Sequence, residues 1–415
     1  MNEKRNIVIT GIGVVSPIGI GKNAYWEGLI EGKTGFKAIT LFETAPFGIH
    51  VAGEISDFNP VDLLGKKGLR ELDRSTRLVN AAAKLALDDG RLDITEDNTH
   101  STGVSVGSTF GSLHSISQFD RQGLIDGPRY VNPSLFPNTV LNSPASRISI
   151  RFRIKGFNTT ISTGFCAGLD AISYACDFIR LKRVHRVLAG GVEELCEETF
   201  HGFHALGCLS GSDGSEPRCC PFDRRRNGTV LSEGAAVLIL EDEEQAVRRG
   251  AHITARILGC GNHFDPEAKR DFSHEGKGLK EAIALALHDA GIASEDIECI
   301  IAGANSTKGL DRLETRAIKE MFGNRAYAIP VTAIKSMIGE SFSASGSLAV
   351  VAAAGIVTRH VIPATVNYRE RDPECDLDCV PNESRQKNVG TVLVLAADPY
   401  GNNSAVIVGT FPGNG

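Results

Sequence analysis

The residues with the clearest potential for chemistry lie in one short segment, residues 161–175, with the sequence ISTGFCAGLDAISYA. The turn Ser-Thr-Gly at 162–164 leads into an apolar stretch rich in alanine and glycine, which predicts a buried helix. A cysteine at such a junction suits acyl transfer, because the helix N-terminus stabilises a thiolate and lies close to an oxyanion site. The junction residue is Phe165, however, and the cysteine follows it as Cys166. Whether the chain has chemistry of its own depends largely on this offset.

Length and composition are those of a globular protein with a large core. The chain has 415 residues, of which 42% are hydrophobic and 23% charged. A net charge of −6 gives no electrostatic reason to expect nucleic-acid binding. The sequence has no secretion signal and no apolar run of about 18 residues, so we expect a cytoplasmic protein without a membrane span.

The cysteines are expected to be reduced thiols. All ten are scattered along the chain, apart from adjacent Cys219 and Cys220 and a lone C-x3-C formed by Cys375 and Cys379. Zinc would need a second matched pair or nearby histidines, and neither segment has them. The sequence therefore predicts no metal site.

Strand and helix patterns alternate along the chain, and their order repeats in its second half. The predicted strands are residues 6–15, 102–107, 186–191 and 234–241, then 253–259, 299–303, 391–396 and 405–410. The predicted helices are residues 23–31, 73–89 and 168–183, then 277–290, 310–322 and 344–359.

Two of these helices, at 168–178 and 344–356, consist of small apolar residues on nearly all faces and occupy corresponding places in the two halves. A helix that is apolar all round is buried, and small residues let it pack closely against sheets. The pattern predicts a five-layered α/β/α/β/α sandwich of two pseudo-duplicated halves, residues 1–250 and 251–415. Taken alone, it also fits two ordinary doubly wound domains.

Six ordered segments carry a resemblance to a known family. They are residues 9–19, 162–175, 221–241, 305–315, 335–350 and 398–408. Together they resemble the β-ketoacyl synthase branch of the thiolase superfamily over essentially the whole chain. The form STG-x-x-x-GLDAI-x-YA is most similar to type II polyketide ketosynthases. The resemblance implies a thiolase-like fold, a dimer, and substrates that arrive on the phosphopantetheine arm of an acyl carrier protein, with no bound cofactor.

Active members of that family need a cysteine, which takes the acyl chain as a thioester, and two histidines, which stabilise the enolate formed by decarboxylation of malonyl thioester. Carried over by position, the cysteine falls on Phe165 and the two histidines fall on Gly303 and Glu340. A phenylalanine cannot form a thioester, a glycine offers no imidazole, and an ionised glutamate would destabilise an enolate. The sequence therefore predicts that the site has lost its chemistry.

Cys166 is the remaining thiol in the motif. One residue along a helix turns a side chain by about 100°, away from the position that the family uses. A small buried residue is the favoured interpretation. The alternative, a β-ketoacyl carrier-protein synthase or malonyl decarboxylase that acts alone through Cys166, stays open, as does a homodimeric binding protein.

Other positions of the motifs are kept or altered. Lys335 and Glu314 match a charged network behind the family's active site, and we interpret them as a buried ion pair that sets loop positions. Tyr400 stands where the family has a gatekeeper phenylalanine. Arg224–Arg226 could meet an acidic carrier protein, although arginine runs are usually solvated.

An inactive ketosynthase resembles the chain length factor of type II polyketide systems, which pairs with an active ketosynthase and shapes the tunnel for the growing chain. The resemblance places tunnel residues on the helix after the glycine-rich turn near residue 110. Leu113, Ile116 and Asp120 fall on one face of that helix and are candidates for the tunnel end or the dimer interface. The expected partners are an active ketosynthase subunit and an acyl carrier protein.

Overall fold

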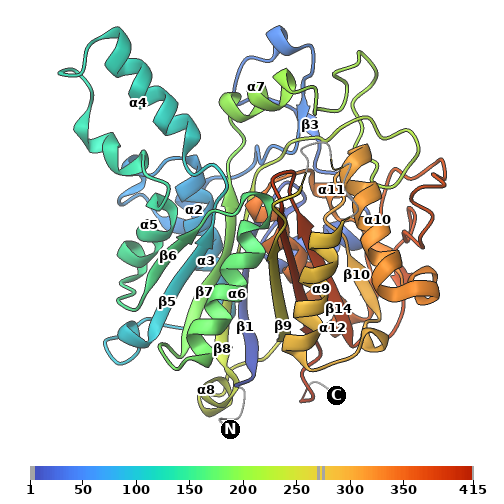
Figure 1. Cartoon of the computed structure of the whole chain (residues 1–415). Helices are drawn as coiled ribbons and strands as arrows, with labels where there is room; N and C mark the ends of the chain where they lie inside the picture. The colour runs from blue at the N-terminus through green and yellow to red at the C-terminus, as the bar shows by residue number, and fades with distance from the viewer. Residues whose placement is uncertain (1–4, 269–271, 273–275, 414–415) are drawn as a thin grey trace.

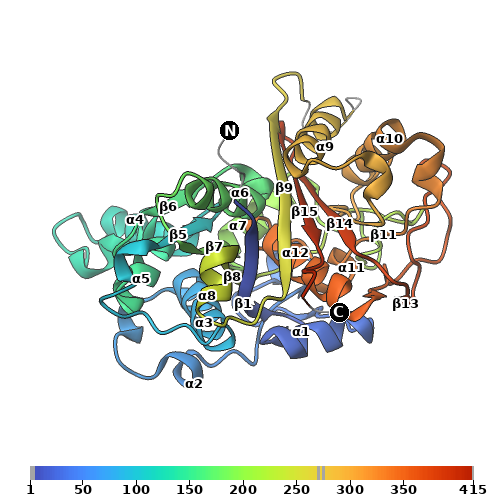
Figure 2. The same ribbon diagram turned by 90° about the horizontal axis from the view of Figure 1, so that it is seen from below.

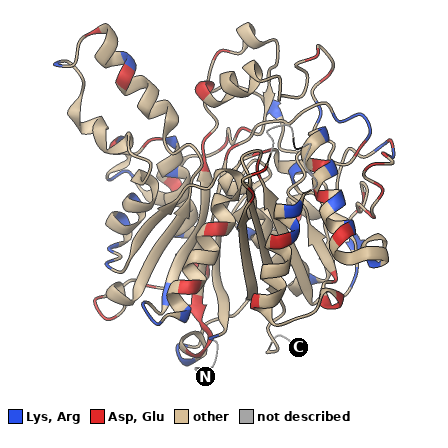
Figure 3. Ribbon diagram, viewed as in Figure 1, with Lys and Arg blue, Asp and Glu red and all other residues tan. Residues whose placement is uncertain are grey.

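The structure, a computed structural model, describes residues 5–268, 272 and 276–413. It has a large central sheet with helices on its faces (Figure 1). Charged residues lie mainly on the outer helices and loops, and the strands carry few (Figure 3). None of the helices in these residues is long and apolar enough to cross a membrane.

The sheet consists of two sections with the same topology. In each section two antiparallel pairings are followed by two parallel ones. The first section runs β1 (Ile7–Ser16), β8 (Gly234–Asp242), β7 (Arg186–Glu193), β5 (Thr102–Gly107), β6 (Asn158–Ile161). The second runs β9 (Ala255–Phe264), β15 (Asn402–Gly409), β14 (Thr391–Ala397), β10 (Cys299–Ile301), β11 (Val331–Thr332). The two sections join where β1 pairs with β9 and diverge from there (Figure 2).

Two helices form the central layer. α6 (Ala167–Arg180) and α12 (Ser343–Arg359) pack against each other and against strands of both sections. α3 (Arg74–Asp89) and α5 (Ser143–Phe152) cover the outside of the first section. α9 (Lys277–Ala290), with α10 (Lys308–Phe322) against it, covers the outside of the second. The predicted five-layered α/β sandwich is confirmed.

Glycines set the spacing of the central layer. A Cβ added at Gly168 of α6 would lie 2.0 Å from the Ser343 carbonyl oxygen, and one at Gly191 of β7 would lie 2.3 Å from it. The small residues therefore bring α12 against both α6 and β7 closely enough to exclude water. Glycines also explain why β9 is longer than predicted: Gly259 and Gly261 weaken the strand signal in the sequence, yet they are needed because α9 packs directly on them.

Two further short helices are α1 (Lys22–Ile30), near the N-terminus, and α7 (Glu197–Ala205), which lies above the sheet in the view of Figure 1. α4 (Leu113–Ile125) and the 3-10 helix η4 (Pro133–Asn138) form a projection that extends away from the sandwich (Figure 1). In this single chain no residue of α4 is buried.

We predict that Gly168→Ala lowers the free energy of unfolding by about 1–3 kcal/mol, because the new methyl group would overpack the contact between α6 and α12. Chemical denaturation measures the change. Gly202→Ala in α7 is the matched control, because a Cβ there meets nothing within 4 Å. It should be neutral or stabilising by roughly 0.5–1 kcal/mol. Equal stabilities of the two variants would contradict close packing at Gly168.

Candidate functional site

Phe165 lies at the predicted junction of turn and helix. It belongs to a 3-10 turn, Gly164–Cys166, that leads into α6. Gly164 has φ 56°, and a Cβ there would lie 1.9 Å from the Asp398 carboxylate, so only glycine fits at this turn. Phe165 is only 8% exposed. Its ring therefore occupies a closed interior position.

Four phenylalanines fill this position, and we call them the aromatic cluster: Phe110, Phe165, Phe203 and Phe342. The Phe342 ring centroid lies 5.0 Å from that of Phe165 and 5.1 Å from those of Phe110 and Phe203. Such pairs each contribute about 0.5–1.5 kcal/mol beyond area burial. The apolar rings of the cluster fill the space at the N-terminal end of α6.

Phe342 is central to the cluster, although no motif in the sequence marks it. Its φ of 47° is in the left-handed region, which a bulky residue rarely adopts. Its N–H donates to Glu340 Oε1 at 2.9 Å, and its ring is held by the three other phenylalanines. A strained backbone conformation has no sequence signal when the residue is not glycine.

Cys166 is fully buried beside the cluster. Its Sγ donates to the Asn402 carbonyl oxygen at 3.3 Å. Burial, with the nearby carboxylates of Asp170 and Asp398, raises the pKa of this thiol well above its usual range. The thiolate is therefore disfavoured where a nucleophile would need it, and the contacts favour a small buried residue.

Gly303, Lys335 and Glu340 converge next to the aromatic cluster, to which Glu340 is joined through the backbone N–H of Phe342. Lys335 Nζ donates to the Gly303 carbonyl oxygen at 2.8 Å and to Glu340 Oε2 at 2.7 Å. Glu340 Oε2 also accepts from Asn305 Nδ2 at 2.9 Å, and Oε1 accepts from Ser345 Oγ at 3.2 Å as well as from the backbone N–H noted above. The resemblance places a histidine at the position of Glu340, and both oxygens of this carboxylate are hydrogen-bonded, with two donors on each.

The ion pair expected at Lys335 forms with Glu340 rather than with Glu314. Glu314 is fully buried, and its Oε1 accepts from the Gly303 N–H at 2.8 Å. Burial raises the pKa of Glu314 to about 8, and the charge of Lys335 opposes that shift. A Cβ at Gly303 would lie 3.0 Å from this same Oε1, so the position has little room for a side chain.

The other candidate residues lie around this centre. Tyr400 is 57% exposed on the turn between β14 and β15, outside the aromatic cluster. Leu113 and Ile116 are half-buried on α4, and Asp120 is exposed. Arg226 differs from a solvated arginine run, because it is fully buried and pairs with Asp372.

Comparisons with known proteins identify the family. Residues 4–246 match the model of the β-ketoacyl synthase N-terminal domain, and residues 254–369 match that of the C-terminal domain. The chain belongs to the β-ketoacyl synthase family. The family likeness extends over nearly the whole chain, as its relatives show.

The relatives within the family include proteins named as 3-oxoacyl-[acyl-carrier-protein] synthases and a polyketide synthase subunit. The chain is 36% identical over 408 residues to 3-oxoacyl-[acyl-carrier-protein] synthase 2 of Coxiella burnetii, covering 98% of this chain and 99% of that protein. It is 38% identical over 416 residues to the tetracenomycin polyketide synthase ketoacyl synthase alpha subunit of Streptomyces glaucescens. This match covers 98% of this chain and 97% of that protein.

Solved structures show the same fold. The ishigamide ketosynthase/chain length factor matches with a TM-score of 0.91 at 34% identity, covering 99% of this chain and 100% of that chain. A type II polyketide ketosynthase, AntDE, in complex with its acyl carrier protein AntF matches with a TM-score of 0.90 at 29% identity. This match covers 99% of this chain and 100% of that chain.

We predict that Glu314→Gln flattens the dependence of stability on pH. With a pKa raised to about 8 from 4.5, folded Glu314 keeps a proton that the unfolded chain releases. The contribution of Glu314 to the free energy of unfolding is complete below about pH 4.5 and is lost as pH rises through about 8. Between these values the free energy of unfolding falls by up to roughly 1.4 kcal/mol per pH unit. Glutamine cannot titrate, so the variant should lose less stability over this range.

Denaturant unfolding between about pH 5 and pH 8 measures this slope. Glu320→Gln, which replaces an exposed carboxylate on the same helix, is the control and should keep the pH dependence of the parent chain. Parallel pH profiles for the parent and Glu314→Gln would contradict the raised pKa of Glu314.

Proposed function

We propose that this chain is a non-catalytic chain length factor, the partner of an active ketosynthase in a type II polyketide or polyene system. The observation that carries the proposal is the coordinated loss of chemistry at Phe165, Gly303 and Glu340, together with an intact fold. A single replacement could be compensated elsewhere, but these three leave neither a thiol nor an imidazole where the family needs them.

The packing around these positions supports the same conclusion. The aromatic cluster occupies the space where an acyl group would meet the nucleophile, and the Glu340 carboxylate is neutralised by Lys335. An enzyme that acts alone through Cys166 would need a reactive thiolate, and the burial of this thiol counts against it. In the proposed function a second subunit supplies the chemistry, and this chain supplies the retained framework.

The projection of α4 and η4 supports a dimer. It leaves large apolar side chains exposed in the single chain: Leu124 is 86% exposed, Tyr130 73% and Phe136 57%. Exposed apolar surface of this kind is typical of a protein interface. We propose that an active ketosynthase of the same fold covers it, and that Leu113, Ile116 and Asp120 then face the tunnel or the interface.

In this complex the partner would perform decarboxylative Claisen condensation. Acyl and malonyl groups would arrive on the phosphopantetheine arm of an acyl carrier protein, with no further cofactor. The proposal gains support from two solved relatives, one named as a ketosynthase/chain length factor and one described as bound to its acyl carrier protein. Tyr400 remains our candidate for a gate at the entrance.

We predict that Ile116→Trp, in the complex with the active ketosynthase, shifts the product toward chains shorter by one or more elongation steps. The larger side chain would fill the end of the tunnel, while the condensing residues of the partner stay intact. Mass spectrometry of the released products measures the distribution of chain lengths.

Ile150→Trp on α5 is the control, because Ile150 is exposed on an outer helix. It should leave product length unchanged. If Ile116→Trp gave the parent product at the parent yield, α4 would not line the tunnel, and the proposed role in setting chain length would fail at this position.

A further inference from the structure

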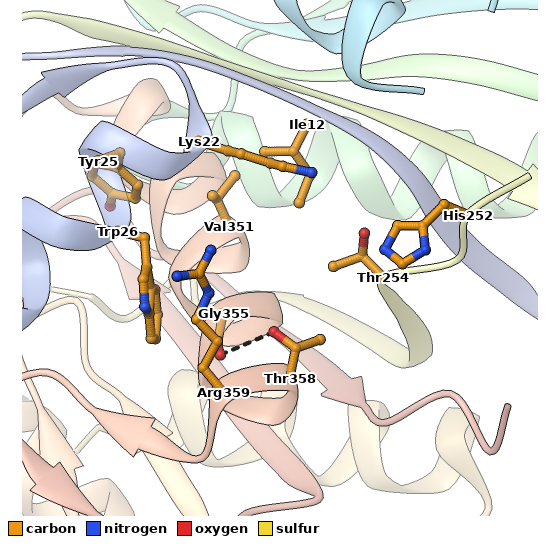
Figure 4. Close-up of a pocket in the computed structure, with 10 residues that line it drawn as sticks. All are labelled: Ile12, Lys22, Tyr25, Trp26, His252, Thr254, Val351, Gly355, Thr358 and Arg359. Atoms are coloured by element: carbon orange, nitrogen blue, oxygen red, sulfur yellow. Dashed lines mark hydrogen bonds between the residues drawn. The ribbon is translucent and has the colours of Figure 1, made fainter. Parts of the chain in front are cut away.

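A cavity lies at the opposite end of α12 from the aromatic cluster (Figure 4). α12 begins beside Phe342 and ends at Arg359, and the cavity, of ≈ 290 Å³, is formed where this end meets α1 and the start of β9. It is lined by Ile12, Lys22, Tyr25, Trp26, His252, Thr254, Val351, Gly355, Thr358 and Arg359.

Arg359 brings a positive charge to this cavity. Its guanidinium donates to Asn23 Oδ1 at 3.3 Å and lies 5.5 Å from the centroid of the Trp26 ring, so both contacts are with neutral groups. Within residues 5–268, 272 and 276–413 it has no carboxylate at ion-pairing distance. Figure 4 shows the guanidinium between Trp26 and Val351, with Lys22 on one side and His252 across the cavity.

Lys22 is a second cation of the lining, although it is partly neutralised. Its ammonium pairs with Asp89, and the other oxygen of that carboxylate accepts from the Ile12 N–H at 2.9 Å. The hydroxyl of Thr358 is occupied, because it donates to the Ala354 carbonyl oxygen at 2.8 Å. The C-terminal end of α12 carries a partial negative charge and does not attract an anion. An anion bound in this cavity would therefore be held by Arg359, Lys22 and His252.

The floor of the cavity is apolar. Ile12, Trp26 and Val351 are buried there, and the indole packs so closely on α12 that a Cβ at Gly355 would lie 2.1 Å from its ring. Tyr25 turns its hydroxyl away, to the Leu348 carbonyl oxygen at 3.1 Å. A neighbouring cavity of ≈ 540 Å³ shares His252, Thr254 and Thr358 with this one.

We propose that this cavity binds a small organic acid, with its apolar body against Ile12, Trp26 and Val351 and its carboxylate on Arg359. Ligand cavities combine a mostly apolar lining with a few polar groups that fix orientation. The planar guanidinium matches a carboxylate in a bidentate contact. A bare phosphate would leave the apolar floor uncovered, so the amphipathic acid fits better. The site is separate from the family's acyl site and does not depend on the proposed function.

The single tryptophan of the chain, Trp26, is a built-in reporter, because its ring belongs to the apolar floor of the cavity and lies beside Arg359. The full-length chain labelled with 5-fluorotryptophan should give a fluorine NMR signal that Trp26→Phe removes. Titration with hexanoate should shift this signal saturably. Acetate, which lacks the apolar body, and 1-hexanol, which lacks the carboxylate, should both bind more weakly.

Arg359→Gln should weaken hexanoate binding by about tenfold or more, since it removes a charge-assisted hydrogen bond. Arg316→Gln, an exposed arginine on α10, is the matched control and should bind like the parent chain. The proposal is overturned if hexanoate gives no saturable shift, or if Arg359→Gln binds it equally well. Inorganic phosphate binding as tightly as hexanoate would also overturn it, because the site would then recognise an oxyanion alone.

Discussion

The buried ion pair between Lys335 and Glu340 holds together the part of the molecule on which the candidate site depends. Lys335 joins the end of the loop at Gly303 to the Glu340 carboxylate, which in turn accepts the N–H of Phe342 and fixes the start of α12. Breaking a buried pair typically costs about 3–5 kcal/mol, because the remaining charge has no partner. At the position where the family resemblance places a histidine, the Glu340 carboxylate thus links Lys335 to the backbone of Phe342.

The aromatic cluster follows from this constraint. With its N–H held by Glu340, Phe342 keeps a left-handed backbone conformation and places its ring against Phe110, Phe165 and Phe203. The rings then bury the junction at which a nucleophile would stand. The aromatic cluster and the Lys335–Glu340 ion pair therefore belong to one arrangement, joined through the backbone N–H of Phe342.

The sequence predicts the fold well because its signals are local and repeated. The strand at β5 and the helix at α9 have the predicted bounds, and the small residues of α6 and α12 mark the central layer. The site is harder to predict, because its partners are distant in sequence. Lys335 and Glu314 could be matched by motif, but only the fold shows that Lys335 pairs with Glu340. Likewise, burial of Arg226 against Asp372 cannot be read from an arginine run.

The most direct test of the central claim is the location of the acyl group in the working complex. The chain should be purified with the ketosynthase that we propose as its partner, loaded from an acyl carrier protein, and measured by intact-protein mass spectrometry. We predict that the acyl mass is found on the partner alone, and that it disappears when the partner's nucleophilic cysteine is replaced. Acyl mass on this chain that Cys166→Ser removes would contradict the account, because the buried thiol would then be the nucleophile.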